Sequence, residues 1–168
     1  MDFRFDEVQQ DLRGLAGEIV GQETTHERLK ELEAGSERMD RALWSELATA
    51  NLLGLSIPEE HGGSGLSVME TALVLEAVGR HVAPVPVLAT AVMGALPVAR
   101  FGSDQLKSRL LPSVVSGEVV LTAAMQEPAN PDLRRPATRA TDLGSGWRLD
   151  GVKVAVPWGL AADHLLVT

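Results

Sequence analysis

The sequence contains no cysteine. This absence excludes disulfide frameworks, thiolate zinc sites and thiol nucleophiles together. The four histidines show no H-x-x-x-H or carboxylate-spaced arrangement that would place two ligands on one helix face, and they are His26, His61, His81 and His164. The sequence therefore predicts no metal site.

Positive charge is also scarce, because 15 Lys and Arg residues against 23 Asp and Glu residues give a formal net charge of -8. Such a surface repels phosphate backbones and anionic lipid, so nucleic acid and membrane surfaces are poor candidate partners. No run approaches the roughly 18 apolar residues of a membrane span, and the acidic opening lacks the basic and apolar regions of a secretory signal. These features favour a cytoplasmic protein.

The composition that remains is that of an ordinary globular protein, with 45% hydrophobic and 23% charged residues. A length of 168 residues allows one well-buried domain and the start of a second. Helical periodicity occupies the first two-thirds of the chain, and strand-like segments begin at Val119. We therefore expect a helical block over residues 1–118 and a β unit over residues 119–168.

Five helices are predicted from their start and stop signals. They cover residues 5–20, 38–53, 68–82, 87–101 and a segment that begins after Ser103 and is stopped or kinked at Pro112. The charge-rich stretch 26–37 is interpreted as a solvated connection. Ser67 and Glu70 form an S-x-x-E capping box before the third helix, whose nearly uniform apolarity is typical of a helix covered on every side.

Strands are predicted at residues 119–125 and 163–168. A hairpin is predicted over 147–156, turning at Asp150-Gly151, because both residues tolerate the positive φ of a type I′ turn. So few strands cannot hide their own edges. The β unit is thus expected to be incomplete, which favours association with a second copy or another partner.

The loop 58–66, PEEHGGSGL, invites interpretation as a phosphate cradle. It lacks the G-x-x-x-x-G-K-S/T lysine, so a helix-connecting turn explains it better. His61 has no paired carboxylate or nucleophile, and Ser64, Ser67 and Ser103 form no G-x-S-x-G motif. Neither acid–base catalysis nor nucleophilic hydrolysis is supported by these residues.

More specific than any single motif is the order of several. P-E-x-x-G-G-x-G at residues 58–65 precedes a helix that ends in E-x-x-G at 76–79. Residues 102–118 carry Gly, Gln, Lys, Leu-Pro and Gly-Glu in turn. Gln-Glu-Pro followed by Asp occupies 126–132, and Asp-Gly-Val-Lys followed by Ala-Asp and an apolar strand occupies 150–167.

These ordered signatures resemble those of acyl-CoA dehydrogenases, particularly bacterial and actinobacterial members. The resemblance implies a mainly α fold, with an N-terminal all-α helical-bundle domain at 1–118 and the beginning of an antiparallel β-barrel-like domain at 119–168. It also implies FAD-dependent removal of an α proton and a β hydride from an acyl-CoA thioester, giving the trans-2-enoyl-CoA. An electron-transferring flavoprotein would accept the electrons, and the protein would form homo- or hetero-oligomers.

By the same resemblance, FAD would lie against two strands, where donors near the flavin stabilise the negative charge that develops on reduction. The implied cofactor-binding residues are Ala124, Met125, Gln126, Val156, Pro157 and Trp158. Gln126 stands where the family commonly has Thr or Ser, and its amide can still donate a hydrogen bond. Pro157 supplies no backbone N–H.

The implied substrate-binding residues are Val92, Leu96 and Arg100 on the fourth predicted helix, together with Asp132. Abstraction of the α proton needs a carboxylate base. In the family that base comes from a C-terminal helical bundle, so it is expected beyond Thr168 and no catalytic residue is assigned. The 168 residues alone are expected to be inactive.

Three hypotheses stay open. The first is the N-terminal part of an acyl-CoA dehydrogenase. The second is a non-catalytic or half-site subunit of a heteromeric acyl-CoA dehydrogenase, which the unusual Gln126, Pro131 and Pro157 would explain. The third is a flavin-dependent monooxygenase or oxidase on the same fold. Acyl chain length and substrate identity are not specified by these residues.

Overall fold

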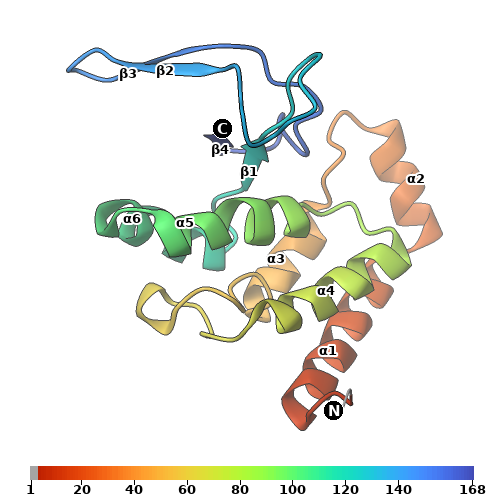
Figure 1. The fold of residues 1–168 in the computed structure, drawn as a ribbon. Coiled ribbons are helices and arrows are strands. Elements are labelled where there is room, and N and C mark those ends of the chain that lie inside the picture. The colour runs from red at the N-terminus through yellow and green to blue at the C-terminus, as the bar shows by residue number, and fades with distance from the viewer. Residues whose placement is uncertain (1–3) are drawn as a thin grey trace.

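The computed structural model describes residues 4–168, and the chain runs from a helical body into short strands (Figure 1). Six α-helices lie in this part of the chain. They are α1 (Glu7–Glu23), α2 (His26–Ala34), α3 (Arg41–Thr49), α4 (Val68–His81), α5 (Leu96–Phe101) and α6 (Asp104–Val115). A short 3₁₀ helix, η1 (Glu59–His61), precedes α4, and a π-helix, η2 (Leu88–Ala95), leads directly into α5. The strands are β1 (Leu121–Ala124), β2 (Arg139–Asp142), β3 (Trp147–Asp150) and β4 (His164–Val167). The mainly α fold with a following β unit is confirmed.

Local capping fixes where the longer helices start. The predicted capping box of α4 is present, with the Ser67 N–H donating to Glu70 Oε2 at 2.8 Å. Glu70 Oε1 accepts a second hydrogen bond, from Gln9 Nε2 of α1 at 2.8 Å. The Glu70 carboxylate therefore caps α4 and also links α4 to α1, and these two helices pack against each other.

The apolar core has two parts. The larger lies among α1, α3 and α4 and includes Val20, Leu43 and Val74, all fully enclosed. The second lies among α5, α6 and β1 and contains Leu111 and Leu121. β1 is buried along its whole length against the helices, so the predicted domain boundary at 118/119 runs through a shared core. The division into two domains stays a prediction.

The fourth predicted helix is continuous, but its first half, η2, has π-helical geometry. The N–H of Leu96 reaches back five residues to the carbonyl of Ala91. Pro97 follows and has no N–H to donate, which favours a change of hydrogen-bonding pattern at this point. Gly94 faces β1 so closely that a Cβ there would overlap Leu121 Cβ.

Four helix predictions are corrected, the one at Pro112 only in that the helix does not stop there. The stretch 26–37, predicted as a solvated connection, contains α2, which Thr25 caps by accepting the Arg28 N–H at 3.1 Å. Helix α6 continues through Pro112 to Val115, since the Pro112 carbonyl still accepts from the Ser116 N–H. Helix α4 is not covered on every side, because Val68 is 54% exposed. Helix α3 is also shorter than the predicted 38–53.

The loop 58–66 is the helix-connecting turn that was predicted, and its glycines serve backbone geometry. Gly62 and Gly65 have φ of 84° and 63°, which side-chain-bearing residues rarely adopt. A Cβ on Gly63 would overlap the carbonyl of Ile57. The glycine-rich motif is thereby accounted for by chain folding.

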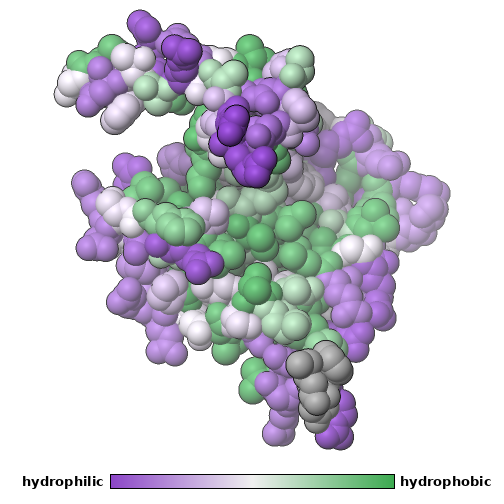
Figure 2. Space-filling view, viewed as in Figure 1, coloured by the Kyte–Doolittle hydropathy of each residue, from purple (hydrophilic) through white to green (hydrophobic). Residues whose placement is uncertain are grey.

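The strands form two separate pairs. β1 and β4 are parallel, with Leu121 opposite His164, and β2 and β3 are antiparallel, with Arg139 opposite Asp150. The β2–β3 hairpin projects from the helical body as an arm, and all of its residues are exposed (Figures 1 and 2). No helix within residues 4–168 is long and apolar enough to cross a membrane.

The hairpin turn predicted at Asp150-Gly151 is wrong. The chain reverses at 143–146 instead, where Gly144 has φ 77° and its N–H donates to Asp142 Oδ1 at 2.8 Å. Asp150 closes β3, and Gly151 lies so close to Thr138 that a Cβ would overlap that side chain. An Asx-type turn over a four-residue loop therefore replaces the tight type I′ turn.

Candidate functional site

The two segments predicted to bind the cofactor lie side by side. The N–H of Val154 donates to the carbonyl of Gln126 at 2.9 Å. The hydroxyl of Thr122, within buried β1, donates to the carbonyl of Pro157 at 2.6 Å. One backbone hydrogen bond and one from a side-chain hydroxyl thus bring residues 124–126 close to residues 156–158, which lie more than twenty-five positions away in the sequence.

Side-chain exposure differs strongly among these residues. Ala124 is 2% exposed and belongs to the core, whereas Met125 is half-buried and Gln126 is exposed. Of the three, Gln126 therefore presents a side-chain hydrogen-bonding group to a ligand.

Segment 155–158 has an unusual backbone. Ala155 and Trp158 have φ of 50° and 55°, in the left-handed region that costs most side-chain-bearing residues about 1–2 kcal/mol. Pro157 lies between them and has no N–H, and its carbonyl already accepts the Thr122 hydroxyl. The segment therefore turns sharply where its Pro–Trp dipeptide reaches the helical body.

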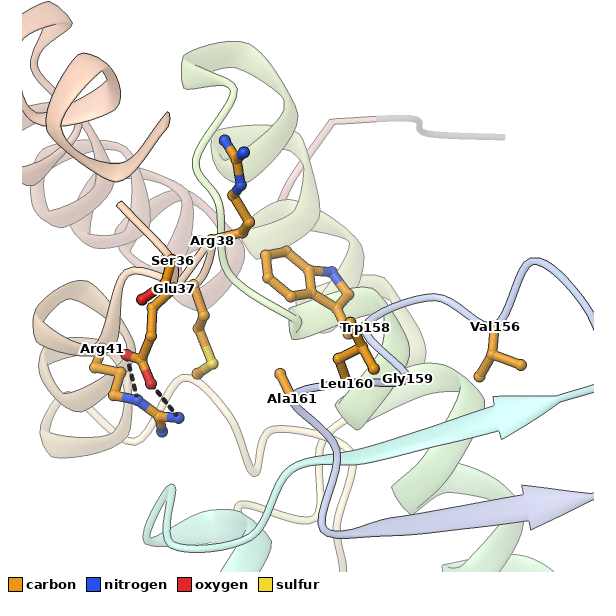
Figure 3. A pocket seen from close by; sticks show the side chains of 10 residues that line it. Ser36, Glu37, Arg38, Arg41, Val156, Trp158, Gly159, Leu160 and Ala161 are labelled. Atoms are coloured by element: carbon orange, nitrogen blue, oxygen red, sulfur yellow. Dashed lines mark hydrogen bonds and ion pairs between the residues drawn. The ribbon is translucent and has the colours of Figure 1, made fainter. Parts of the chain in front are cut away.

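Trp158 faces a cavity of about 540 Å³ between this segment and the connection from α2 to α3 (Figure 3). Val156 lines the same cavity, and Met39 contributes from the opposite side. Residues 124–126 are not among those that line it. The predicted cofactor residues thus divide between the end of β1 and this cavity.

An enclosed ion pair that the sequence motifs did not indicate lies beside the end of β1. Lys153 Nζ is 2.9 Å from Glu127 Oε1, and the two side chains are 9% and 5% exposed. Glu127 also accepts from the Thr138 hydroxyl at 2.6 Å, the Ala137 N–H at 2.6 Å and Asn130 Nδ2 at 2.9 Å. These donors, led by Thr138, hold the pKa of Glu127 far below its usual range.

The predicted substrate-binding residues lie in separate places, unlike the two predicted cofactor-binding segments. Val92 lies in η2 and Leu96 in α5, both half-buried, and the guanidinium of exposed Arg100 is 5.8 Å from the Phe101 ring centroid. Asp132 pairs with Arg134, whose Nε is 3.0 Å from Oδ1, and this hydrogen bond lowers the pKa of Asp132. Within residues 4–168, no group of three His, Asp or Glu side chains is arranged to hold a metal.

Comparison with known proteins identifies the arrangement. Residues 6–118 match the family model described as "Acyl-CoA dehydrogenase, N-terminal domain". The chain is 39% identical over 167 residues to acyl-CoA dehydrogenase FadE27 of Mycobacterium tuberculosis, covering 99% of this chain and 44% of FadE27. It is 30% identical to bovine (Bos taurus) mitochondrial isovaleryl-CoA dehydrogenase, covering 96% of this chain and 39% of that enzyme.

Solved structures show the same fold. The steroid ACAD Tcur3481-Tcur3483 G363A variant superposes with a TM-score of 0.90 at 44% identity, covering 96% of this chain and 44% of that one. The ChsE4-ChsE5 complex of Mycobacterium tuberculosis gives 0.89 at 38% identity, covering 98% and 44%. The chain thus spans less than half the length of these relatives. The matched N-terminal domain and the 39% identity to FadE27 across 99% of this chain show that the chain belongs to the acyl-CoA dehydrogenase family.

Proposed function

We propose that this chain is the N-terminal part of an FAD-dependent acyl-CoA dehydrogenase. The reaction converts an acyl-CoA thioester to the trans-2-enoyl-CoA, with an electron-transferring flavoprotein as electron acceptor and a cytoplasmic oligomer as the working form. The observation that carries the proposal is the meeting of 124–126 with 154–158, joined by the Val154 to Gln126 hydrogen bond of 2.9 Å. We assign the flavin to this junction at the end of β1, where the Gln126 side chain is exposed.

The end of β1 fits the edge of a flavin. Gln126 is exposed and its amide can donate to a polar ring atom, while Met125 offers a half-buried apolar surface beside it. FAD, when bound, supplies the acceptor for the β hydride. The chain's own contribution is a fixed backbone, because the end of β1 is held by β4 and by the Glu127–Lys153 ion pair.

The remaining parts of the reaction are assigned with the same proposal. Val92, Leu96, Arg100 and Asp132 are assigned to binding of the acyl-CoA. The base that takes the α proton is assigned to the part of the family's fold that this chain does not cover.

One observation favours a second candidate, a non-catalytic or half-site subunit of a heteromeric acyl-CoA dehydrogenase. Pro157 has no N–H, its carbonyl is occupied by Thr122, and Trp158 lines the cavity beside the α2–α3 connection. This second segment offers a flavin few donors. Two of the similar structures are named as pairs of different chains, Tcur3481-Tcur3483 and ChsE4-ChsE5.

The test uses the complete reading frame, purified alone and after co-expression with a candidate partner subunit. Bound flavin is measured from the visible spectrum, and products are identified after incubation with acyl-CoA and an artificial electron acceptor. Enoyl-CoA from the protein alone supports the first candidate. Enoyl-CoA and flavin that depend on the partner support the second, and a hydroxylated product would instead indicate a monooxygenase.

A further inference from the structure

The cavity beside Trp158 has the size of a small-molecule site. Its volume of about 540 Å³ falls within the roughly 300–1,000 Å³ typical of ligand pockets. It lies between two segments distant in sequence, 36–41 before and within the start of α3, and 156–161 before β4 (Figure 3).

One wall of the cavity is apolar. Trp158, Leu160 and Ala161 form it on the side of the β unit, and Met39 adds a flexible thioether chain on the helical side. A half-buried indole and a thioether together suit a ring system or a compact hydrocarbon body. Leu160 is fully exposed, so this wall stays accessible from solvent.

The opposite rim is charged in an uneven way. Glu37 and Arg41 neutralise each other, with Arg41 Nε and Nη2 at 3.0 and 3.3 Å from the Glu37 oxygens, and Asp163 adds a further attraction for Arg41. Arg38 donates through Nη1 to the carbonyl of Glu33 at 2.8 Å. No carboxylate within residues 4–168 forms an ion pair with Arg38.

The paired Glu37 and Arg41 and the charge of Arg38, unpaired within residues 4–168, together favour an anionic ligand. The Arg38 guanidinium retains donors that are not engaged by Glu33 and can form two parallel hydrogen bonds with a carboxylate. Arg38 is among the residues that line the cavity, and Figure 3 shows its side chain starting beside the Trp158 indole with the guanidinium directed away from Glu37 and Arg41. A ligand with an apolar body over the indole could therefore place an anionic end at Arg38.

The backbone around Trp158 fits a site that is formed in advance. Ala155 and Trp158 both have positive φ, and the Thr122 hydroxyl fixes the Pro157 carbonyl between them at 2.6 Å. Residues in such sparsely populated conformations persist when their surroundings hold them and gather at ligand sites. The backbone that carries the indole is thus held in place before any ligand binds.

We propose that this cavity binds a small organic carboxylate with an apolar ring body, held by Trp158 and Arg38. The site is distinct from the end of β1, because residues 124–126 do not line it. The inference depends on the cavity alone and holds whether or not the proposed dehydrogenase function does.

The probe is 1-naphthoate, and its uncharged analogue 1-naphthalenemethanol is the reference. Each is titrated calorimetrically into the complete protein. Naphthoate is expected to bind about tenfold more tightly than the alcohol, as a charge-assisted bidentate hydrogen bond provides. Arg38→Met should remove this preference and leave the affinity for the alcohol unchanged. Leu160→Glu changes a fully exposed position that contributes little to folding. It should weaken the binding of naphthoate relative to the unsubstituted protein, because the added carboxylate repels the ligand's negative charge.

Arg139→Met is the matched control, because Arg139 is an exposed arginine on the projecting hairpin. It removes one positive charge, as Arg38→Met does, and should leave naphthoate binding unchanged. Equal affinities for the two naphthalenes, no binding of either at millimolar concentration, or equal effects of the two arginine substitutions would overturn the proposal.

Discussion

Lys153 Nζ lies 2.9 Å from Glu127 Oε1, with both side chains almost enclosed at 9% and 5% exposure. Lys153 also donates to the Thr168 hydroxyl at 3.2 Å, and Glu127 receives donors from residues 130, 137 and 138. One ion pair therefore connects the end of β1, the loop that follows it, the segment before β2 and the end of β4. In this β unit with few strands, side-chain hydrogen bonds connect segments that backbone hydrogen bonds would connect in a larger sheet.

Glu127→Gln is expected to destabilise the protein at neutral pH and to flatten its response to acid. Because the folded state depresses the pKa of Glu127, its contribution is complete above the unfolded value of about 4.3 and is lost as the pH falls below it. Thermal unfolding midpoints between pH 7 and 3 check this. Some slope remains in the variant, since the pKa values of Asp40 and Glu70 are also lowered.

The control for this prediction is Glu46→Gln, because Glu46 is exposed on α3 and forms no ion pair within residues 4–168. It should follow the unsubstituted protein across the whole pH range. Parallel acid responses of the Glu127→Gln variant and the unsubstituted protein would show that the ion pair does not stabilise the fold.

Gly94→Ala is expected to destabilise the protein by about 1–3 kcal/mol, because its Cβ would overlap Leu121 Cβ where η2 packs on β1. Urea unfolding measures the change. Gly14→Ala in α1 is the matched substitution, since nothing lies within 4 Å of the added methyl. It should stabilise by about 0.5–1 kcal/mol through helix propensity, and a similar gain at Gly94 would disprove the close packing.

Ala155→Gly is expected to stabilise the protein by up to about 1 kcal/mol. The native φ of 50° is strained for alanine and free for glycine, although glycine also gains entropy in the unfolded chain. Ala72→Gly on the exposed face of α4 is the contrast and should cost about 0.5–1 kcal/mol. Equal destabilisation at both positions would argue against the left-handed turn.

Asp40 has two roles that separate in substitution. It caps α3 by accepting the Ala42 and Leu43 N–H groups at 3.1 and 3.2 Å, and it holds Arg28 at 2.9 and 3.0 Å. Asp40→Asn keeps the cap and loses the charge, whereas Asp40→Ala loses both. Chemical unfolding should show the alanine variant about 1 kcal/mol less stable than the asparagine variant, and equal stabilities would exclude a capping role.

The sequence predicts the helices best where local signals agree. Ser67 and Glu70 supplied both halves of a capping box before an apolar run, and α4 begins there. Helix α2 is not predicted, because its many charged residues favour a solvated connection. Its helical pattern is weak and consists of a Thr25 cap followed by Leu29 and Leu32 at helical spacing. What holds that helix to the body is the Arg28–Asp40 pair, a tertiary contact that periodicity does not reveal.

The β unit is harder to predict because its contacts are distant in sequence. Asp150-Gly151 has the composition of a tight turn, but the reversal is set by Asp142 and Gly144, and Gly151 is used for close approach to Thr138. The ordered signatures include 124–126 and 156–158, and the Val154 to Gln126 and Thr122 to Pro157 hydrogen bonds bring these segments together. Their role in cofactor binding stays a prediction. The Glu127–Lys153 pair and the Arg38 side of the cavity have no local signature.

The most direct test of the proposed dehydrogenase is an anaerobic titration of the complete protein, with its partner subunit where one is required, using acyl-CoA. The proposal predicts that bound flavin loses its visible absorption as acyl-CoA is added and that one enoyl-CoA forms per flavin reduced. A complete protein that holds no flavin in either form, or whose flavin spectrum is unchanged by every acyl-CoA tested, would contradict it.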